Sequence, residues 1–370
     1  MFSPRSEFID EVLTQLREED LDLEEEDDVA GFLGVKVDRD SKSGEIKMTQ
    51  IGLINRIIEA LGCDSLPGKK TPAEYGALGT DKNGDPPQEA FSYASVIGML
   101  QYLHTHTRPD LALAVSQCSR FIHCTRRSHE LALIRIGQYL KMTQDKGLVL
   151  RPTNEMGIDC YVDADFAGLW GVEDPQDPTS VKSRTGYVLC LVGCPVIWAS
   201  KLQTDIALST MEAEYSALSM ALKELLPLKR LVQTVAQAVE IPVEQEILMR
   251  VTGWEDNTGA LTLDNLEPGR MTPRSKHYGV KYHWFRQHLK PNGIQVLKID
   301  TKDQQADMLT KALRTDKFEL NRKQFMGWLA STILTDHLRS KGSVKILAKT
   351  VRYLASPGIA WLRRNEDRYT

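Results

Sequence analysis

The sequence predicts an α/β fold built on a mixed five-stranded sheet, with the first three strands antiparallel and helices flanking the sheet. Residues 158–163 alternate apolar with polar side chains, which is the period-two pattern of a strand with two unlike faces. Strand-like runs over 185–191 and 195–199 are joined by a short turn and form a hairpin. From Ser209 to residue 313 helices and strands alternate, which is typical of a layered α/β domain.

The chain before this domain predicts a smaller sheet and a helical region. Apolar spacing predicts, in order, a helix over 8–23, a strand pair over 32–38 and 45–48, and a helix over 51–61. Residues 63–90 are rich in Pro, Gly, Lys and Asp and lack periodicity, which predicts a linker. Three further helices are predicted over 91–103, 109–122 and 128–142, followed by a strand from residue 147.

The long helix of the main domain is predicted from residue 209 to about residue 235. It begins with a capping-box pattern, because Ser209 is followed three residues later by Glu212. Pro227 lies inside it and predicts a kink. The remaining elements are predicted as a strand over 247–251, a helix over 258–263, a helix over 276–290, a strand over 294–299 and a helix over 304–313.

Composition and charge indicate an intracellular globular protein. The 370 residues, 42% of them hydrophobic, can form two or three domains with cores of their own. No apolar run reaches the length of a membrane span, and six scattered cysteines without a CxxC pair indicate reduced thiols. The lack of an HExxH pattern sets a zinc peptidase aside. The net charge of -4 argues against a uniformly basic nucleic-acid binder, although basic residues cluster between Arg270 and Arg286.

Three acidic residues stand where chain ends of the predicted sheet could meet. Asp163 lies on the first strand, Asp256 follows the fourth, and Glu214 borders the apolar face of the long helix. A buried carboxylate without a partner is costly, and the next basic residue after Asp163 is Lys182. Taken singly, each acid also fits a solvated strand end or helix side. Taken together, they favour a bound cation.

Seven ordered motifs resemble the ribonuclease H domain of copia-type LTR retrotransposon Pol polyproteins. They are YVDADFAG (161–168), KSRTGY (182–187), WASK (198–201), ALSTMEAEY (207–215), EDN (255–257), MTPRSKH (271–277) and QADMLTK (305–311). Upstream, FLG (32–34), YASVIGMLQYL (93–103) and TRPD (107–110) resemble the end of the same family's reverse transcriptase and its connection region. The resemblance implies four parts: a truncated end of a reverse-transcriptase palm over 1–62, a linker over 63–90, a helical connection region over 91–152 and a ribonuclease H-like domain over 153–315. The remaining residues depart from the family and are expected to form a basic C-terminal tail over 316–370.

The resemblance also implies the chemistry. Asp163, Glu214, Asp256 and Asp307 match the family's four catalytic carboxylates, which would hold two Mg²⁺ ions, or Mn²⁺, about 4 Å apart. One ion would activate the attacking water and the other would stabilise the leaving 3′ oxygen. The substrate would be the RNA strand of an RNA–DNA hybrid, cut endonucleolytically. Asp307 rests on the resemblance alone, because it lies nearly opposite the apolar stripe of its predicted helix.

Polar residues inside these motifs are expected to contact nucleic acid. They are Arg184, Lys201, Asn257, Arg274, Ser275, Lys276 and His277. The last four form a basic stretch at a predicted helix start, which favours phosphate binding, although an ordinary surface patch fits that stretch equally well.

Further expectations concern polymerase activity, location and an alternative function. The family's polymerase motif lies before the predicted first helix, so no DNA synthesis is expected from this chain alone, and another Pol chain would supply the palm. The expected location is the cytoplasm, the nucleus or a virus-like particle, with no membrane and no small-molecule cofactor. The alternative is a retroelement relic or nucleic-acid-binding module without turnover. The intact acids favour the enzyme.

Overall fold

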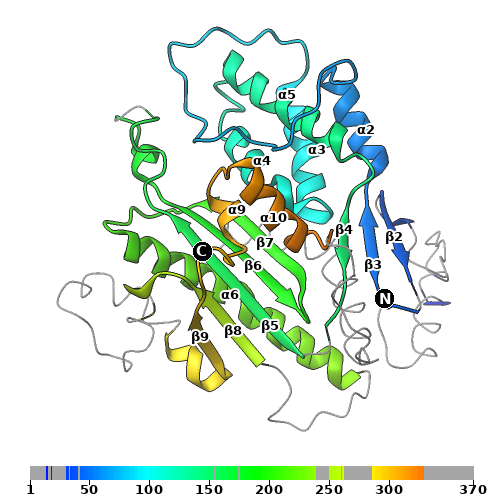
Figure 1. Ribbon diagram of the computed structural model, residues 1–370, viewed down its shortest axis with the longest axis vertical. Helices are drawn as coiled ribbons and strands as arrows, with labels where there is room; N and C mark the ends of the chain where they lie inside the picture. The colour runs from blue at the N-terminus through cyan, green and yellow to red at the C-terminus, as the bar shows by residue number, and fades with distance from the viewer. Residues whose placement is uncertain are drawn as a thin grey trace.

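The chain forms two β-sheets and two helical layers, seen here in a computed structural model (Figure 1). The structure describes residues 14, 15, 18, 31–32, 34–40, 42–153, 156–173, 176–238, 250–259, 261 and 286–328. Almost all of the predicted helix over 8–23, most of the one over 276–290 and the chain beyond residue 328 lie outside these ranges. No helix in the described ranges combines the length and the apolar character that a bilayer crossing needs.

The larger sheet is mixed and five-stranded, as predicted, with the strand order β7-β6-β5-β8-β9. Its strands are β5 (Gly157–Asp165), β6 (Arg184–Leu191), β7 (Cys194–Leu202), β8 (Arg250–Glu255) and β9 (Ile294–Lys298). The antiparallel pairing of the first three strands is confirmed, and β8 runs parallel to β5. Parallel pairing brings the C-terminal ends of β5 and β8 to the same edge of the sheet.

Helix α6 (Thr210–Ala238) covers one face of this sheet. Its apolar residues Leu218 and Leu222 pack with Ile158, Cys160 and Val162, the alternate residues of β5. The predicted cap is confirmed: the Glu212 backbone N–H donates to Ser209 Oγ at 3.1 Å. The Glu212 carboxylate in turn accepts from the Leu208 N–H at 2.8 Å. Helix α6 is therefore fixed at the end that approaches the edge where β5 and β8 end.

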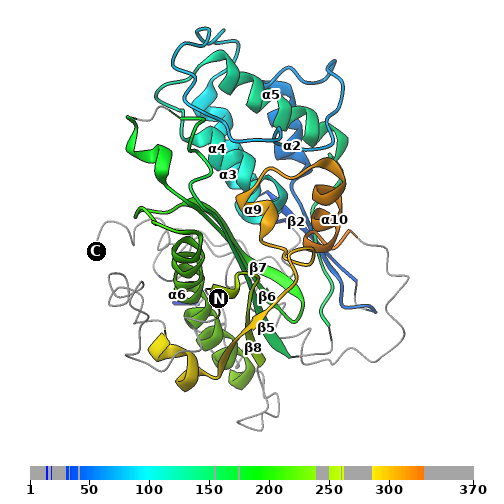
Figure 2. The same ribbon diagram turned by 60° about the vertical axis from the view of Figure 1, so that its left-hand side comes forward.

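The opposite face of the sheet is covered by the helical region and by the last elements of the chain (Figure 2). These elements are α2 (Ile51–Ala60), α3 (Tyr93–His106), η1 (Pro109–Leu111), α4 (Ala112–Ser119), α5 (Arg127–Met142), α9 (Asp307–Thr310) and α10 (Thr315–Phe325). Val188 and Cys190 of β6 share one apolar cluster with Leu100 of α3, Leu309 of α9 and Phe325 of α10. Figure 2 shows α6 on one side of the sheet and α9 with α10 on the other.

Two predicted helices are shorter than expected. The prediction of one helix over 109–122 is wrong at its start, where a 3-10 turn, η1, precedes α4. The prediction of a helix over 304–313 is wrong in length, because α9 spans only Asp307–Thr310. In the second case the chain folds into turns before and after α9, so the four residues dock as a single turn against β6. Side-chain positions on that turn are set by the docking and not by a helical stripe.

The smaller sheet joins segments that are distant in sequence. Its strands β1 (Gly31–Phe32), β2 (Val35–Arg39), β3 (Ile46–Thr49) and β4 (Leu148–Leu150) pair in that order, all antiparallel. The end of α10 also bonds this sheet, because the Val149 N–H donates to the Met326 carbonyl at 3.0 Å. Residues 316–328, expected to begin a basic tail, therefore form a packed helix and its bonded end.

Candidate metal centre

Three carboxylates meet at the edge where β5 and β8 end. Asp163 comes from β5, Glu214 from the N-terminal end of α6, and Asp256 from the residue after β8; one oxygen from each lies within 4.8 Å of the others. Asp163 and Glu214 are 1% and 4% exposed, and Asp256 is half-buried. The β5–β8 ladder ends at the pair Tyr161–Trp254, so the acids lie just beyond the last paired residues. The three residues that the sequence placed together are thus brought together.

The burial and mutual repulsion of these carboxylates favour the binding of a cation. Burial, and then the negative charges of Asp163, Glu255 and Asp256, raise the pKa of Glu214 to about 10. Burial also raises the pKa of Asp163 to about 6, against the opposing charge of Lys311. Glu214 Oε2 is buried without a hydrogen-bond partner, which is costly for a carboxylate oxygen. An all-oxygen set with one unsatisfied buried member fits a hard divalent cation.

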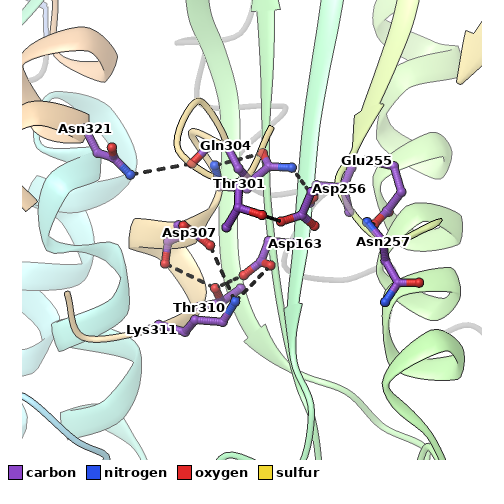
Figure 3. Close-up of polar contacts among 12 residues, drawn as sticks. Asp163, Glu255, Asp256, Asn257, Thr301, Gln304, Asp307, Thr310, Lys311 and Asn321 are labelled. Carbon is purple, nitrogen blue, oxygen red and sulfur yellow. Dashed lines mark hydrogen bonds and ion pairs between the residues drawn. The ribbon is translucent and has the colours of Figure 1, made fainter. Parts of the chain in front are cut away.

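Asp307, the fourth predicted ligand, is held differently. It is fully buried at the start of α9, yet it does not belong to the one metal-sized group of acids found in the described ranges. Its Oδ1 lies 3.4 Å from Lys311 Nζ, and its Oδ2 accepts from Lys317 Nζ. Lys311 Nζ also lies 3.1 Å from Asp163 Oδ1 (Figure 3). Two ammonium groups therefore satisfy the carboxylate that sequence reasoning assigned to a metal.

A glycine on β6, Gly186, allows α9 to approach Asp163 closely. Gly186 is the antiparallel partner of Asp163, and a Cβ built on it would lie 2.6 Å from Thr310 Cγ2 and 2.8 Å from Leu309 Cβ. The Thr310 hydroxyl donates to Asp163 Oδ2 across this contact. The close approach thus fixes one oxygen of Asp163 by a hydroxyl and leaves the other to Lys311.

Gly186→Ala is expected to destabilise the protein by about 1–3 kcal/mol, because the added methyl group overpacks the contact with α9. It should also reduce any activity of the site by displacing Thr310 and Asp307. The matched control is Gly253→Ala on β8, where an added Cβ meets nothing closer than 3.6 Å. Both variants lose the same glycine flexibility, so the difference in urea unfolding isolates the clash. Equal stability of the two variants would contradict close packing at Gly186.

A turn that the sequence did not single out holds Asp256 and the strand ends. The Thr301 hydroxyl donates to Asp256 Oδ2 at 3.0 Å (Figure 3). The buried Gln304 amide donates to the Val162 carbonyl at 2.8 Å and to the Trp254 carbonyl at 3.3 Å, and so bridges β5 and β8 at the end of their ladder. The only sequence signal was the position of this turn between a strand and Asp307.

The polar residue inside the first strand has a structural partner. Both carboxylate oxygens of Asp159 accept from Arg250, at 2.8 and 2.9 Å, and Trp254 Nε1 donates to Oδ1 at 2.8 Å. The sequence offered no nearby base, since the next one along the chain is Lys182, but the parallel pairing of β5 with β8 brings Arg250 alongside. Asp159 is thereby accounted for without a metal.

Arg184, which was predicted to contact nucleic acid, is buried in the structure. Arg184 is only 4% exposed, and its Nη1 donates to Ser116 Oγ at 2.7 Å and to Ser200 Oγ at 3.2 Å. Burial lowers the pKa of this guanidinium to about 10. Arg184 therefore ties α4 to the sheet, and a motif position shared with a nucleic-acid enzyme does not imply exposure.

The other predicted contacts stay predictions. Lys201 is exposed near the end of β7. Asn257 is half-buried, and its Oδ1 accepts from the Gly259 N–H at 2.9 Å, which shapes the turn after Asp256. The basic stretch of Arg274, Ser275, Lys276 and His277 lies outside the described residues.

Comparison with known proteins places the chain among transposon polyproteins. It is 33% identical over 296 residues to the retrovirus-related Pol polyprotein from transposon TNT 1-94 of Nicotiana tabacum, covering 78% of this chain and 21% of that protein. It is 32% identical over 231 residues to the corresponding polyprotein from transposon RE1 of Arabidopsis thaliana, covering 61% and 14% of the two. The RE2 polyprotein of the same plant is 28% identical over 297 residues, covering 80% and 19%.

The chain belongs to the copia-type family of retrovirus-related Pol polyproteins. It spans about a fifth or less of the length of these three relatives. No established family profile matches it. No solved structure matches it either.

Proposed function

We propose that this chain hydrolyses the RNA strand of RNA–DNA hybrids, as the ribonuclease H part of a retrotransposon Pol polyprotein. The observation that carries the proposal is the cluster of three carboxylates, from Asp163, Glu214 and Asp256, at the strand ends of a five-stranded mixed sheet. One of its buried oxygens, Glu214 Oε2, has no hydrogen-bond partner. The ordered motifs around these acids resemble those of ribonucleases H, and membership in the Pol family supports the same class.

The three carboxylates are suited to Mg²⁺, with Mn²⁺ as the alternative ion. When bound, such an ion supplies Lewis acidity toward a phosphoryl oxygen and makes a water nucleophile available near neutral pH. The chain's own residues provide the preorganisation. Thr310 and Lys311 fix both oxygens of Asp163, and Thr301 fixes Asp256. These contacts hold the ligands in place before substrate arrives, which is where much of the catalytic gain of such sites lies.

The side from which substrate would reach the site follows from exposure. Asp163 and Glu214 are buried, whereas Asp256 is half-buried and the neighbouring Thr301 is exposed. A hybrid would therefore approach over Asp256 and the turn at 301–303. Of the described residues in the predicted set, Lys201 is exposed and carries the positive charge that a phosphate would contact.

Asp163→Asn is expected to lower cleavage of a labelled RNA–DNA hybrid by at least about a hundredfold, because even outer residues of metal sites cost ten- to a hundredfold. The assay uses purified chain with Mg²⁺ or Mn²⁺ and follows the RNA strand. The control is Asp145→Asn, an exposed acid that follows α5 and lies outside the site, which should leave the rate unchanged. Hybrid binding without cleavage in either metal would refute the nuclease and support a binding module.

A further inference from the structure

The positively charged side chain of Lys311 lies beside the cluster of Asp163, Glu214 and Asp256. Lys311 directly follows α9, and its Nζ lies 3.1 Å from Asp163 Oδ1 and 3.4 Å from Asp307 Oδ1. Both of those carboxylates are buried, whereas the Lys311 side chain is 41% exposed. Figure 3 shows the ammonium group reaching both acids from the α9 side. Lys311 thus bridges the first and the last of the predicted catalytic acids.

We propose that the site holds one divalent ion, at Asp163, Glu214 and Asp256, and that the Lys311 ammonium occupies the place a second ion would need between Asp163 and Asp307. The inference rests on the proposed function, since it concerns the same site. It replaces the two-ion arrangement that the sequence motifs imply with one ion and one fixed positive charge.

Ligand oxygens are the first argument. Two ions about 4 Å apart need a shared carboxylate between them and further oxygens for each. Asp163 Oδ1 is bonded by Lys311 and Oδ2 by Thr310. Asp307 Oδ1 faces Lys311, and its Oδ2 accepts from Lys317. Asp163 keeps lone pairs for the first ion, whereas a second ion would have to displace both ammonium groups to gain Asp307 as a ligand.

Charge is the second argument. The four carboxylates Asp163, Glu214, Asp256 and Asp307, together with their buried neighbour Glu255, face two ammonium groups, Lys311 and Lys317, which leaves three negative charges when all are ionised. One divalent ion neutralises most of that remainder. A second ion would give these residues a net positive charge with Lys311 still in place, and close like charges repel strongly in a buried setting. Both arguments lead to the same number of ions.

The test counts Mn²⁺ ions on the full chain without substrate, by titration calorimetry and electron paramagnetic resonance. Only ions that Asp163→Asn removes are counted, so that other acidic surfaces do not contribute. Wild type is expected to bind one such ion with the spectrum of an isolated Mn²⁺. Lys311→Met is expected to bind two, with the spin coupling of ions about 4 Å apart. The matched control is Lys317→Met, which removes an ammonium that bonds Asp307 but leaves the Lys311–Asp163 bond, and should bind one.

Two Asp163-dependent ions in wild type, or a single ion in Lys311→Met, would overturn the inference. Should the Met variant fail to fold, the wild-type count and its spectrum decide the matter alone. Failure of the proposed function is recognised separately, because ion counting needs no cleavage. A wild type that cuts hybrid with two ions refutes only the inference. One that binds a single ion and cuts nothing refutes only the nuclease.

Discussion

Glu214→Gln is expected to abolish hybrid cleavage and yet to raise the stability of the metal-free protein at pH 8. Glu214 is buried among carboxylates, and its Oε2 has no hydrogen-bond partner. Burial and the charges of Asp163 and Asp256 disfavour the ionised form, so at pH 8 folding must add a proton to Glu214, and glutamine removes this cost. The same change removes a ligand oxygen from the proposed metal site. Activity and stability should therefore move in opposite directions, as expected where function maintains unfavourable charge.

The direction of this stability change follows from the way in which the free energy of unfolding depends on pH. The pKa of Glu214 is raised from 4.5 to about 10 in the folded chain, first by burial and then by its acidic neighbours. Between those values the folded state keeps a proton that the unfolded state has lost, so stability falls as pH rises. The slope is at most about 1.4 kcal/mol per pH unit. Asp163, with its pKa raised from 3.8 to about 6, adds a fall in the same direction at lower pH.

Urea unfolding at pH 5, 7 and 9 in chelator measures this dependence, and Glu214→Gln should flatten it. The control is Glu212→Gln on the same helix, whose carboxylate accepts from the Leu208 N–H and which should keep the wild-type slope. Added Mg²⁺ should stabilise wild type more than Glu214→Gln, because ligand binding to the folded state adds stability. A lower stability of Glu214→Gln at pH 8 would mean that its carboxylate already has a cationic partner.

Arg108→Met is expected to cost about 3–5 kcal/mol of folding free energy, because it leaves a buried carboxylate without its partner. Arg108 is fully buried, and its Nε and Nη2 donate to the two oxygens of Asp110 at 2.9 and 2.8 Å. Nη1 and Nη2 also donate to Thr143, on its carbonyl and its hydroxyl. The guanidinium lies over the Trp328 ring, 5.7 Å from its centroid, and so links the helical region to the end of α10.

Two further variants separate the lost pair from a general cavity effect. Arg108→Met combined with Asp110→Leu should recover much of the loss, because replacing both ions by apolar groups is often nearly neutral. The control is Arg135→Met, a half-buried arginine that donates to Thr71 and pairs with Glu74, whose side chain is 80% exposed; it should cost clearly less than Arg108→Met, because Glu74 remains solvated when its partner is removed. If the Arg108 and Arg135 variants lose the same stability in urea unfolding, the buried pair has no special role.

The sequence predicted those parts of the fold that local periodicity encodes. The alternation in β5, the hairpin of β6 and β7, and the capped apolar stripe of α6 each specify their element within a few residues. Asp163 and Asp256 could be placed together because they stand on or just after predicted strands whose ends could meet. The parallel pairing of β5 with β8, which brings them to one edge, is seen only in the structure. Glu214 needed the family motif as well, since a helix edge alone does not say what it faces.

What could not be predicted depends on packing between distant segments. The Arg250 partner of Asp159 lies 91 residues further along the chain. The burial of Arg184 depends on Ser116 of α4, and the two lysines on Asp307 depend on how α9 docks against β6. A helical wheel placed Asp307 on the outer side because it assumed ten helical residues where four exist. Local patterns carry no information on such contacts.

The bonding of α10 to β4 has a consequence for how the polyprotein can be divided. The Trp328 indole donates to the Gly147 carbonyl at 2.6 Å, and the Val149 N–H donates to Met326, so the strand that closes the small sheet is bonded to the end of the chain's last described helix. A cut near residue 152 would separate these partners and uncover the apolar side of β6. A stable excised fragment would therefore keep the helical region, which is a structural part of the core beneath the larger sheet and not only a spacer.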